Sequence, residues 1–310
     1  MPDPDWDKVR TVTKVITAPT MRPDGSLLQK PGHDDATGVL YKPSTDFPHI
    51  EESPSLDTCR ECAKALVEVV RDFPFAGASA SLSAWMAGLF TCVARSAIEG
   101  PTPLFAVTAN SLGTGKTRLA ATASQIAFGH EPVCFPPPPD ESTFEKRITL
   151  AVDNDIPFCL IDNVCRQLQS PALSGALTAR EWSYRAFGSS HHKTRPMRTV
   201  WWAAGNHLAM DDDLARRTLV IQLVAPKHEQ HDERNNFMHR DLSSWVKREQ
   251  PRLIACALTV VRGYIVADRP GRTTPWGSFE SWSALIPGIL TWLGYSDPMT
   301  MRWHKVLQRE

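Results

Sequence analysis

A glycine-rich segment between a strand-like run and a helix-like run constrains this fold more than any other feature. The run "PLFAVTA" (103–109) is apolar and β-prone, and it is followed by "NSLGTGKT" and then by the alanine-rich "RLAATASQIAF". A strand that enters a helix through such a loop is typical of a parallel sheet with crossover helices. The start of that helix presents free N–H donors and the positive end of its dipole, which favours phosphate groups.

The loop matches the pattern G-x-x-x-x-G-K-[ST] except at its first position, where Asn110 replaces glycine. Asparagine tolerates a left-handed backbone better than most residues, so we expect this departure to be mild. Lys116 is expected to contact the β- and γ-phosphates of ATP, and the Thr117 hydroxyl to hold Mg²⁺. The residues predicted to bind the nucleotide are Asn110, Gly113, Thr114, Gly115, Lys116 and Thr117.

Further apolar runs extend the alternation of strands and helices. Strands are predicted at "PVCF", "PFCLID", "TVWWAAGN" and "RTLVIQL", and helices over 116–128 and 142–152. This pattern predicts an α/β P-loop NTPase with a parallel sheet flanked by helices. After residue 225 the pattern turns helical, over about 239–268 and 279–293, which predicts an α-helical C-terminal lid.

The chain is therefore divided into four expected parts. A strand- and turn-rich lead-in covers 1–54, an N-terminal helical segment 55–100, the P-loop ATPase core 101–225 and the lid 226–310. Lys+Arg and Asp+Glu both number 34, so any contact with nucleic acid must come from a local basic patch.

Two other features bear on location and metal binding. The uncharged stretch 73–94 carries Pro74, Gly77, Gly88 and several serines, so we expect a buried core helix, no membrane partner and a cytoplasmic protein. Of the seven cysteines, several lie in apolar runs, which fits reduced, packed thiols: Cys92, Cys134, Cys159 and Cys256. Cys59 and Cys62 lack a second metal-binding pair and recur at helical spacing, which favours core packing over a zinc site.

The strand "FCLID" ends in a carboxylate suited to the metal. Asp162 follows apolar residues at the carboxyl end of a predicted neighbouring strand, and we expect it to bind Mg²⁺. Many ATPases place a glutamate after it to polarise the attacking water, whereas Asn163 cannot accept a proton. Glu141 and Glu145 are nearby in sequence, and nothing in the sequence decides between them.

Two later segments supply further catalytic candidates. Asn206, at the end of "TVWWAAGN", is an uncharged donor suited to sensing the γ-phosphate. Arg216 and Arg217 in "DLARR" fit a role across a subunit boundary, where a guanidinium stabilises charge on a neighbour's γ-phosphate. The alternative is that these arginines form salt bridges with the aspartates at 211–213.

The order of six segments resembles the AAA+ ATPase part of mobile-element primase–helicases, which are related to superfamily 3 helicases. These segments are "GTGKT", "LIDN", "REWSYRAFGSS", "WWAAGN", "DLARR" and "GSFESWSALIPGIL". The resemblance implies a ring, hexameric in such proteins, with ATP at subunit interfaces and single-stranded or forked DNA in the channel. It also implies primase or other replication proteins as partners. Aspartate followed by asparagine at 162 and 163 is similar to what these relatives carry.

The resemblance further implies a DNA-contacting hairpin before the sensing strand, in the stretch "FGSSHHKTRPMRTVWW". Its segment "SSHHKTRPMR" contains three cations and no acid, so it suits a phosphate backbone, although a solvated basic loop has the same composition. The residues assigned to DNA are His191, His192, Lys193 and Arg195. In the same stretch Tyr184 stands before Arg185, where the family often has an acid.

Two functions follow from these residues. The first is an ATP-driven DNA motor of a mobile-element replication system, with Lys116, Asp162, Asn163, Asn206 and Arg216 or Arg217 in its catalytic site. The second is a nucleotide-binding scaffold that assembles and recruits replication partners with little or no hydrolysis, which Asn163 favours.

Overall fold

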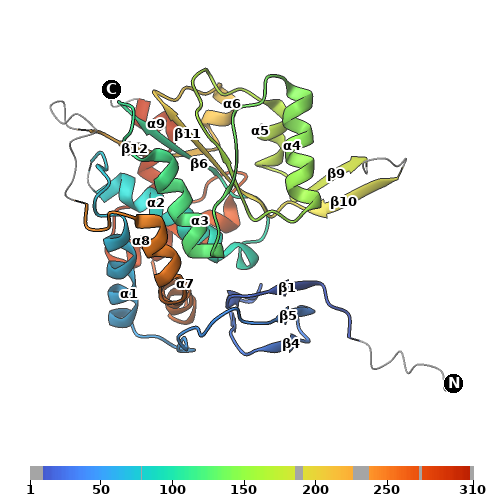
Figure 1. The fold of residues 1–310 in the computed structure, drawn as a ribbon, viewed down its shortest axis with the longest axis vertical. Helices are drawn as coiled ribbons and strands as arrows, with labels where there is room; N and C mark the ends of the chain where they lie inside the picture. Colours follow the sequence, from blue (N-terminus) through green and yellow to red (C-terminus); the bar gives the residue numbers. More distant parts are fainter. Residues whose placement is uncertain (1–9, 78, 186–190, 226–236, 272–273, 308–310) are drawn as a thin grey trace.

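A five-stranded parallel sheet forms the centre of the molecule (Figure 1). The computed structural model describes residues 10–77, 79–185, 191–225, 237–271 and 274–307. The strand order is β12-β6-β11-β8-β7, so β11 lies between the strand before the glycine loop and the strand that ends before Asp162. The five strands are β6 (Leu104–Ala109), β7 (Val133–Phe135), β8 (Phe158–Ile161), β11 (Val200–Asn206) and β12 (Thr218–Leu223).

The strands form where the sequence predicts them because their apolar runs are long enough to be buried on both faces of a parallel sheet. The α/β P-loop fold is confirmed. Cys134 is an exception to the predicted packing of the cysteines, since its strand β7 lies at the sheet edge and its side chain is exposed.

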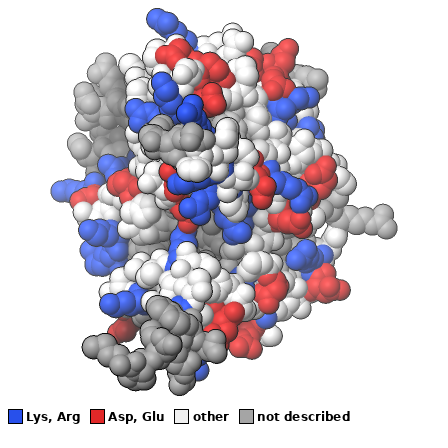
Figure 2. Space-filling model, turned by 90° about the vertical axis from the view of Figure 1, so that its right-hand side faces the viewer, with Lys and Arg blue, Asp and Glu red and all other residues white. Residues whose placement is uncertain are grey.

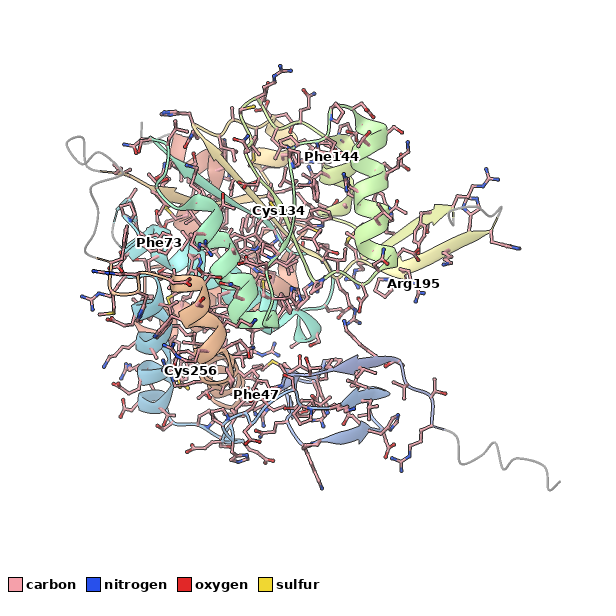
Figure 3. All side chains as sticks on the ribbon, in the orientation of Figure 1. Phe47, Phe73, Cys134, Phe144, Arg195 and Cys256 are labelled. Carbon is pink, nitrogen blue, oxygen red and sulfur yellow. The ribbon has the colours of Figure 1, made fainter. Side chains whose placement is uncertain are left out.

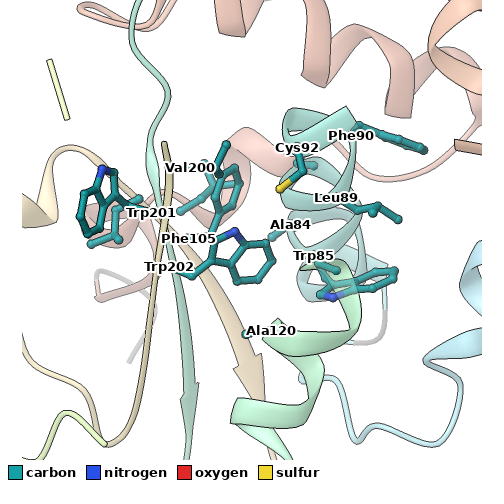
Figure 4. Packing of buried hydrophobic residues seen from close by; sticks show 14 of the residues in the cluster. Ala84, Trp85, Leu89, Phe90, Cys92, Phe105, Ala120, Val200, Trp201 and Trp202 are labelled. Carbon is teal, nitrogen blue, oxygen red and sulfur yellow. The ribbon is translucent and has the colours of Figure 1, made fainter. Parts of the chain in front are cut away.

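Helices cover both faces of this sheet. α2 (Ser79–Val93) and α3 (Lys116–Phe128) pack on one face, and α4 (Glu141–Asp153) and α5 (Pro171–Ala176) lie on the other (Figure 1). Trp201 and Trp202 point to opposite sides of β11, and Trp202 packs toward α2 (Figure 4). A Cβ at Gly88 would lie 2.3 Å from the Trp202 ring, so only glycine lets α2 approach this closely.

The C-terminal helices complete the layer that holds α2. α7 (Leu242–Val266) packs against α1 (Leu56–Val69) and α3, and α8 (Glu280–Leu293) packs against α2. Cys59 and Cys62 lie in the α1–α7 contact, where Cys62 hydrogen bonds with Cys256, in agreement with core packing. Four further short helical elements of the described ranges lie between or after the longer ones. η2 (Arg95–Ala97) follows α2, and α6 (Asp212–Ala215) precedes β12. η4 (Pro298–Met301) and α9 (Trp303–Leu307) follow α8.

Among the residues that the structure describes, three small sheets lie outside the central sheet. The first is built from β1 (Lys14–Ile16), β4 (Gly32–Asp34) and β5 (Val39–Tyr41), and the second is the hairpin of β2 (Thr20–Met21) and β3 (Leu27–Leu28). The third is the projecting hairpin of β9 (Glu181–Arg185) and β10 (His192–Pro196), whose turn lies outside the described residues (Figure 1). No helix in the described part of the chain could cross a bilayer, and the apolar stretch before residue 94 forms the buried α2.

Candidate functional site

The glycine loop has the backbone that a phosphate cradle needs. Gly113 and Gly115 have positive φ angles of 70° and 85°, and Gly115 is the N-cap of α3. Asn110 is not among the described residues with positive φ, so the loop does not use the tolerance of asparagine for a left-handed backbone. Its side-chain oxygen instead accepts a 3.1 Å hydrogen bond from the backbone N–H of Ala225, which ties the loop to the chain just after β12.

A phenylalanine that the sequence analysis missed supports this loop. A Cβ at Gly115 would lie 2.8 Å from the ring of Phe73, so the ring packs directly on the glycine. Figure 3 shows where Phe73 lies in the molecule. The segment 73–76 is held beside β12 by backbone hydrogen bonds from Ala76 to Gln222 and from Val224 to Pro74, both 2.8 Å. Only the helix break at "FPFAG" is visible in the sequence, and it does not reveal this contact.

Thr117 and Asp162 meet at the carboxyl end of the sheet. The Thr117 hydroxyl donates to the Asp162 carboxylate and lies 3.0 Å from each of its oxygens. The two residues are far apart in sequence and come from the first turn of α3 and the end of β8. The structure therefore brings together the two oxygen ligands predicted for the metal.

Lys116 lies among oxygen atoms at the same edge. Its Nζ donates to the side-chain oxygen of Asn206, to Thr114 Oγ1 at 3.2 Å and to the Ser111 carbonyl at 3.3 Å. Burial lowers the pKa of Lys116, and the nearby Asp162 carboxylate acts in the opposite direction. A partly buried ammonium held by neutral oxygens is suited to receive an anion.

These residues fit a magnesium–nucleotide complex. Mg²⁺ prefers oxygen ligands and is usually held in proteins by one or two side chains together with phosphate oxygens and water. Thr117 and Asp162 would supply those side-chain oxygens, and Gly113 and Gly115 leave the loop N–H groups without a neighbouring Cβ. Among the described residues no cluster of three His, Cys, Asp or Glu side chains forms a different metal site.

Asn163 lies directly beside this centre. It is exposed and has a positive φ of 58°, a conformation that asparagine adopts more readily than most residues. The chain after it is pinned to β11, because Val164 donates to the Ala204 carbonyl at 2.9 Å and a Cβ at Gly205 would lie 2.3 Å from the Val164 carbonyl. The close packing of Val164 and Gly205 thus fixes the direction in which residues 162–163 leave β8.

The two glutamates considered as a base lie on α4. Glu141 accepts a hydrogen bond from the backbone N–H of Ala172 in the first turn of α5, so its carboxylate is engaged. Glu145, one turn later, is exposed. Neither is placed against Asp162 by a described contact.

Arg216 and Arg217 lie at the opposite edge of the sheet. The Leu104 amide, at the start of β6, donates to the Arg217 carbonyl at 3.0 Å, whereas the glycine loop leaves the far end of β6 about 17 Å away. Both side chains pair with Asp213, as the alternative interpretation predicted. Their exposure differs, since the Arg217 side chain is 13% exposed and that of Arg216 is 63% exposed.

The basic hairpin is arranged differently from the expected loop. Lys193 and Arg195 lie within β10, opposite Tyr184 and Trp182 of β9, so they face the same side as those aromatic residues. Lys193 is 3.4 Å from Asp153 at the end of α4, and the Tyr184 hydroxyl donates to the same carboxylate.

All four hairpin residues assigned to DNA are exposed. His191 and His192 begin the returning arm, and the Arg195 side chain is visible at the hairpin in Figure 3. Tyr184, which occupies the position of an expected acid, therefore anchors the hairpin to α4 through Asp153.

Comparison with known proteins gives distant structural similarities. No family model and no curated protein matches the chain. Two similar solved structures are the apo A form of the NrS-1 C-terminal region and JCV helicase with a thiazolopyridine compound bound, each 14% identical. The match to the NrS-1 region has a TM-score of 0.44 and covers 77% of this chain and 53% of that one. The match to JCV helicase has a TM-score of 0.34 and covers 77% of this chain and 67% of that one.

The chain thus spans about half the length of the NrS-1 region that it matches. Neither TM-score reaches 0.5, so the function proposed below rests on the geometry of the site.

Proposed function

We propose that this protein binds and hydrolyses ATP with Mg²⁺ and acts as a helicase-like motor on single-stranded DNA. The observation that carries the proposal is the meeting of Thr117 with Asp162, and of Lys116 with Asn206, at the end of a strand–loop–helix unit. Four residues from three segments of the chain converge there, each of the type that phosphate or metal binding requires.

Each residue has a distinct role in this proposal. Lys116 neutralises charge on the β- and γ-phosphates, and Thr117 and Asp162 hold the metal. The bound Mg²⁺ would supply charge neutralisation at the phosphate oxygens. Asn206 contacts Lys116 in the described structure and would orient it or a γ-phosphate oxygen once the nucleotide is bound.

The proposed motor is a ring in which one copy completes the site of the next. Arg216 and Arg217 cannot reach the glycine loop of their own chain, because their backbone lies at the other end of β6. Arg216 is the better candidate for the neighbouring site, since it is mostly exposed while Arg217 is mostly buried against Asp213. A guanidinium supplied by a neighbour stabilises the charge of the transition state.

The β9–β10 hairpin is the proposed DNA contact. It projects from the body of the molecule (Figure 1). The four of its residues assigned to DNA are exposed: His191, His192, Lys193 and Arg195. Positively charged side chains of this kind bind phosphate backbones with an affinity that decreases as salt increases. In a ring, several such hairpins would face a shared channel.

The central experiment measures ATP hydrolysis with and without single-stranded DNA, together with the oligomeric state. We expect DNA to stimulate hydrolysis, and Lys116→Ala to abolish both basal and stimulated turnover. Lys146→Ala is a matched control, because Lys146 is an exposed lysine of α4 with no described ion pair. Absence of hydrolysis by the assembled parent protein with DNA present would show that the motor proposal is wrong.

Asn163 supports a second candidate, a nucleotide-binding scaffold that assembles replication proteins without turnover. An exposed amide next to Asp162 cannot take a proton from water, and Glu141 is occupied by the backbone of α5. Tight Mg²⁺-dependent ATP binding without phosphate release, in a protein that still oligomerises, would favour the scaffold.

A further inference from the structure

A cavity lined by arginines lies at the base of the β9–β10 hairpin. It has a volume of about 700 Å³ and is bounded by the β2–β3 hairpin, the segment after α2 and the ends of β9 and β10. Figure 2 views this side of the molecule and shows Lys and Arg side chains gathered near the middle, around a hollow. The charged residues that line the cavity are Arg95, Glu99, Arg180, Glu181 and Arg198.

Arg95 carries a charge that the described residues do not neutralise. Its guanidinium donates to three backbone carbonyls, those of Ile98 at 2.9 Å, Gly100 at 2.9 Å and Met197 at 2.6 Å. Its buried Nε has no hydrogen-bond partner, and no described carboxylate lies within ion-pair distance. An arginine held only by neutral groups keeps its full charge in a place where water cannot solvate it well.

A second arginine increases this excess of positive charge. Burial, together with the weaker effect of the neighbouring Arg198, lowers the pKa of Arg95 to about 10. Arg198 is exposed and forms no described ion pair. Two like charges close together, with no carboxylate between them, are stabilised by an anion that binds both.

The acids of the cavity leave this charge in place. Glu99 pairs with Arg180 at 2.7 Å, so these two residues largely neutralise each other. Glu181 is the other acid of the lining, and it forms no described ion pair with Arg95 or Arg198. Arg95 donates to the carbonyl of Met197, the residue before Arg198, so the two uncompensated arginines lie near each other in the cavity lining.

We propose that this cavity binds a phosphate group of the same single strand that the hairpin contacts. The inference rests on the proposed function, because it assumes that the hairpin is the DNA contact. Lys193 and Arg195 lie in β10, and Arg198 follows two residues after its end, about 16 Å along the chain from Lys193, so a strand that follows these cations would end at the cavity. The planar fork of an arginine matches a phosphate better than a lysine ammonium does.

The test compares Arg198→Ala with Lys193→Ala and with the control Arg248→Ala, which removes an exposed arginine from α7. Binding of fluorescent oligo-dT to the full chain is measured by anisotropy over a series of salt concentrations. We expect Arg198→Ala to weaken binding and to reduce the slope of log affinity against log salt by about 0.7, the value for one single-strand phosphate contact. Arg248→Ala should leave both quantities unchanged, and its DNA-free ATP hydrolysis should equal that of the parent protein.

Arg95→Lys is a second variant that keeps the charge at the buried position. A lysine cannot donate to three carbonyls and a phosphate together, so DNA binding should weaken. If this variant does not fold, Arg198→Ala still decides the matter, because Arg198 is exposed.

The outcomes separate this inference from the proposed function. An Arg198→Ala protein that binds oligo-dT with the parent's affinity and slope, while Lys193→Ala binds more weakly, would overturn the cavity site and leave the motor intact. A parent protein that binds no DNA would overturn the proposed contact itself. In that case, thermal stabilisation by inorganic phosphate that Arg198→Ala loses would indicate a free-phosphate site and would also overturn the assignment to a strand.

Discussion

The two edges of the central sheet hold different kinds of polar residue. At the carboxyl edge Lys116, Thr117, Asp162 and Asn206 bond to one another and form a compact group. At the amino edge, arginines bond to carbonyls or to a single aspartate, as Arg95 and Arg217 do. The first edge has a cation, a carboxylate and neutral oxygens in place, whereas the second has positive charge in excess.

This difference indicates that the two edges would have separate roles in the proposed motor. In that proposal the carboxyl edge would hold a nucleotide within one chain. The amino edge presents cations that need an anion from elsewhere, either the nucleotide of a neighbouring copy or a DNA strand. Variants at the two edges should therefore fail in different ways.

The largest expected effect is at the amino edge, at Arg216. Arg216→Ala should reduce ATP turnover on the order of 10³-fold without loss of nucleotide binding, because an arginine supplied in trans contributes that much. Mixing it with Lys116→Ala should restore partial turnover, since some interfaces would combine one intact loop with one intact arginine. If mixed assemblies form and do not recover activity, Arg216 does not contribute to the site of a neighbouring copy.

Asp162→Asn tests the carboxyl edge. Loss of a metal-binding carboxylate should slow turnover on the order of 10²-fold or more, since the metal supplies several kcal/mol of charge stabilisation. The melting temperature should change little, because an amide keeps the shape and can still accept from the Thr117 hydroxyl. Steady-state hydrolysis over a range of Mg²⁺ concentrations measures the effect, and parent-like activity at all of them would contradict the metal role.

Gly115→Ala tests whether the loop geometry is set by packing. A Cβ there would meet the Phe73 ring and would also adopt a φ of 85°, so we expect a loss of about 1–3 kcal/mol in stability together with weaker nucleotide binding. The double variant with Phe73→Ala should recover part of the loss that comes from the clash. Chemical denaturation of the four proteins in this cycle gives the coupling.

The smallest effect is expected at Tyr184. Tyr184→Phe removes the hydroxyl that bonds to Asp153 and should cost about 1 kcal/mol, confined to the hairpin. Hydrogen exchange should increase in β9 and β10, while basal ATP hydrolysis stays unchanged. A clear decrease in basal ATP hydrolysis in Tyr184→Phe would contradict the view that the hairpin and the carboxyl edge act separately.

The sequence predicts the central sheet well because its information is local. Buried parallel strands are long apolar runs, and α3 begins at Lys116 as the glycine loop predicts. Asp162 and Asn206 could be found as polar residues at the ends of such runs. Their contacts with Thr117 and Lys116 follow from strand order, which a single sequence suggests only through its motifs.

The parts that could not be predicted depend on contacts between distant segments. The role of Asn110 depends on the backbone of Ala225, and the support of Gly115 depends on Phe73. The hairpin could be placed from the resemblance, but the pairing of Lys193 with Asp153 could not. Arg95 follows α2 in a segment that carries no motif. The absence of a described carboxylate beside its guanidinium depends on which distant segments pack around it.

The segment 73–76 has a practical consequence for how the protein can be divided. Its backbone covers the free side of β12, and its ring supports the phosphate loop, although it precedes the strand that begins the sheet in sequence. A fragment cut immediately before β6 would expose the amide of Val224 and the carbonyl of Gln222 as an unprotected strand edge prone to self-association. A fragment that keeps this edge covered and the glycine loop supported therefore begins upstream of Phe73.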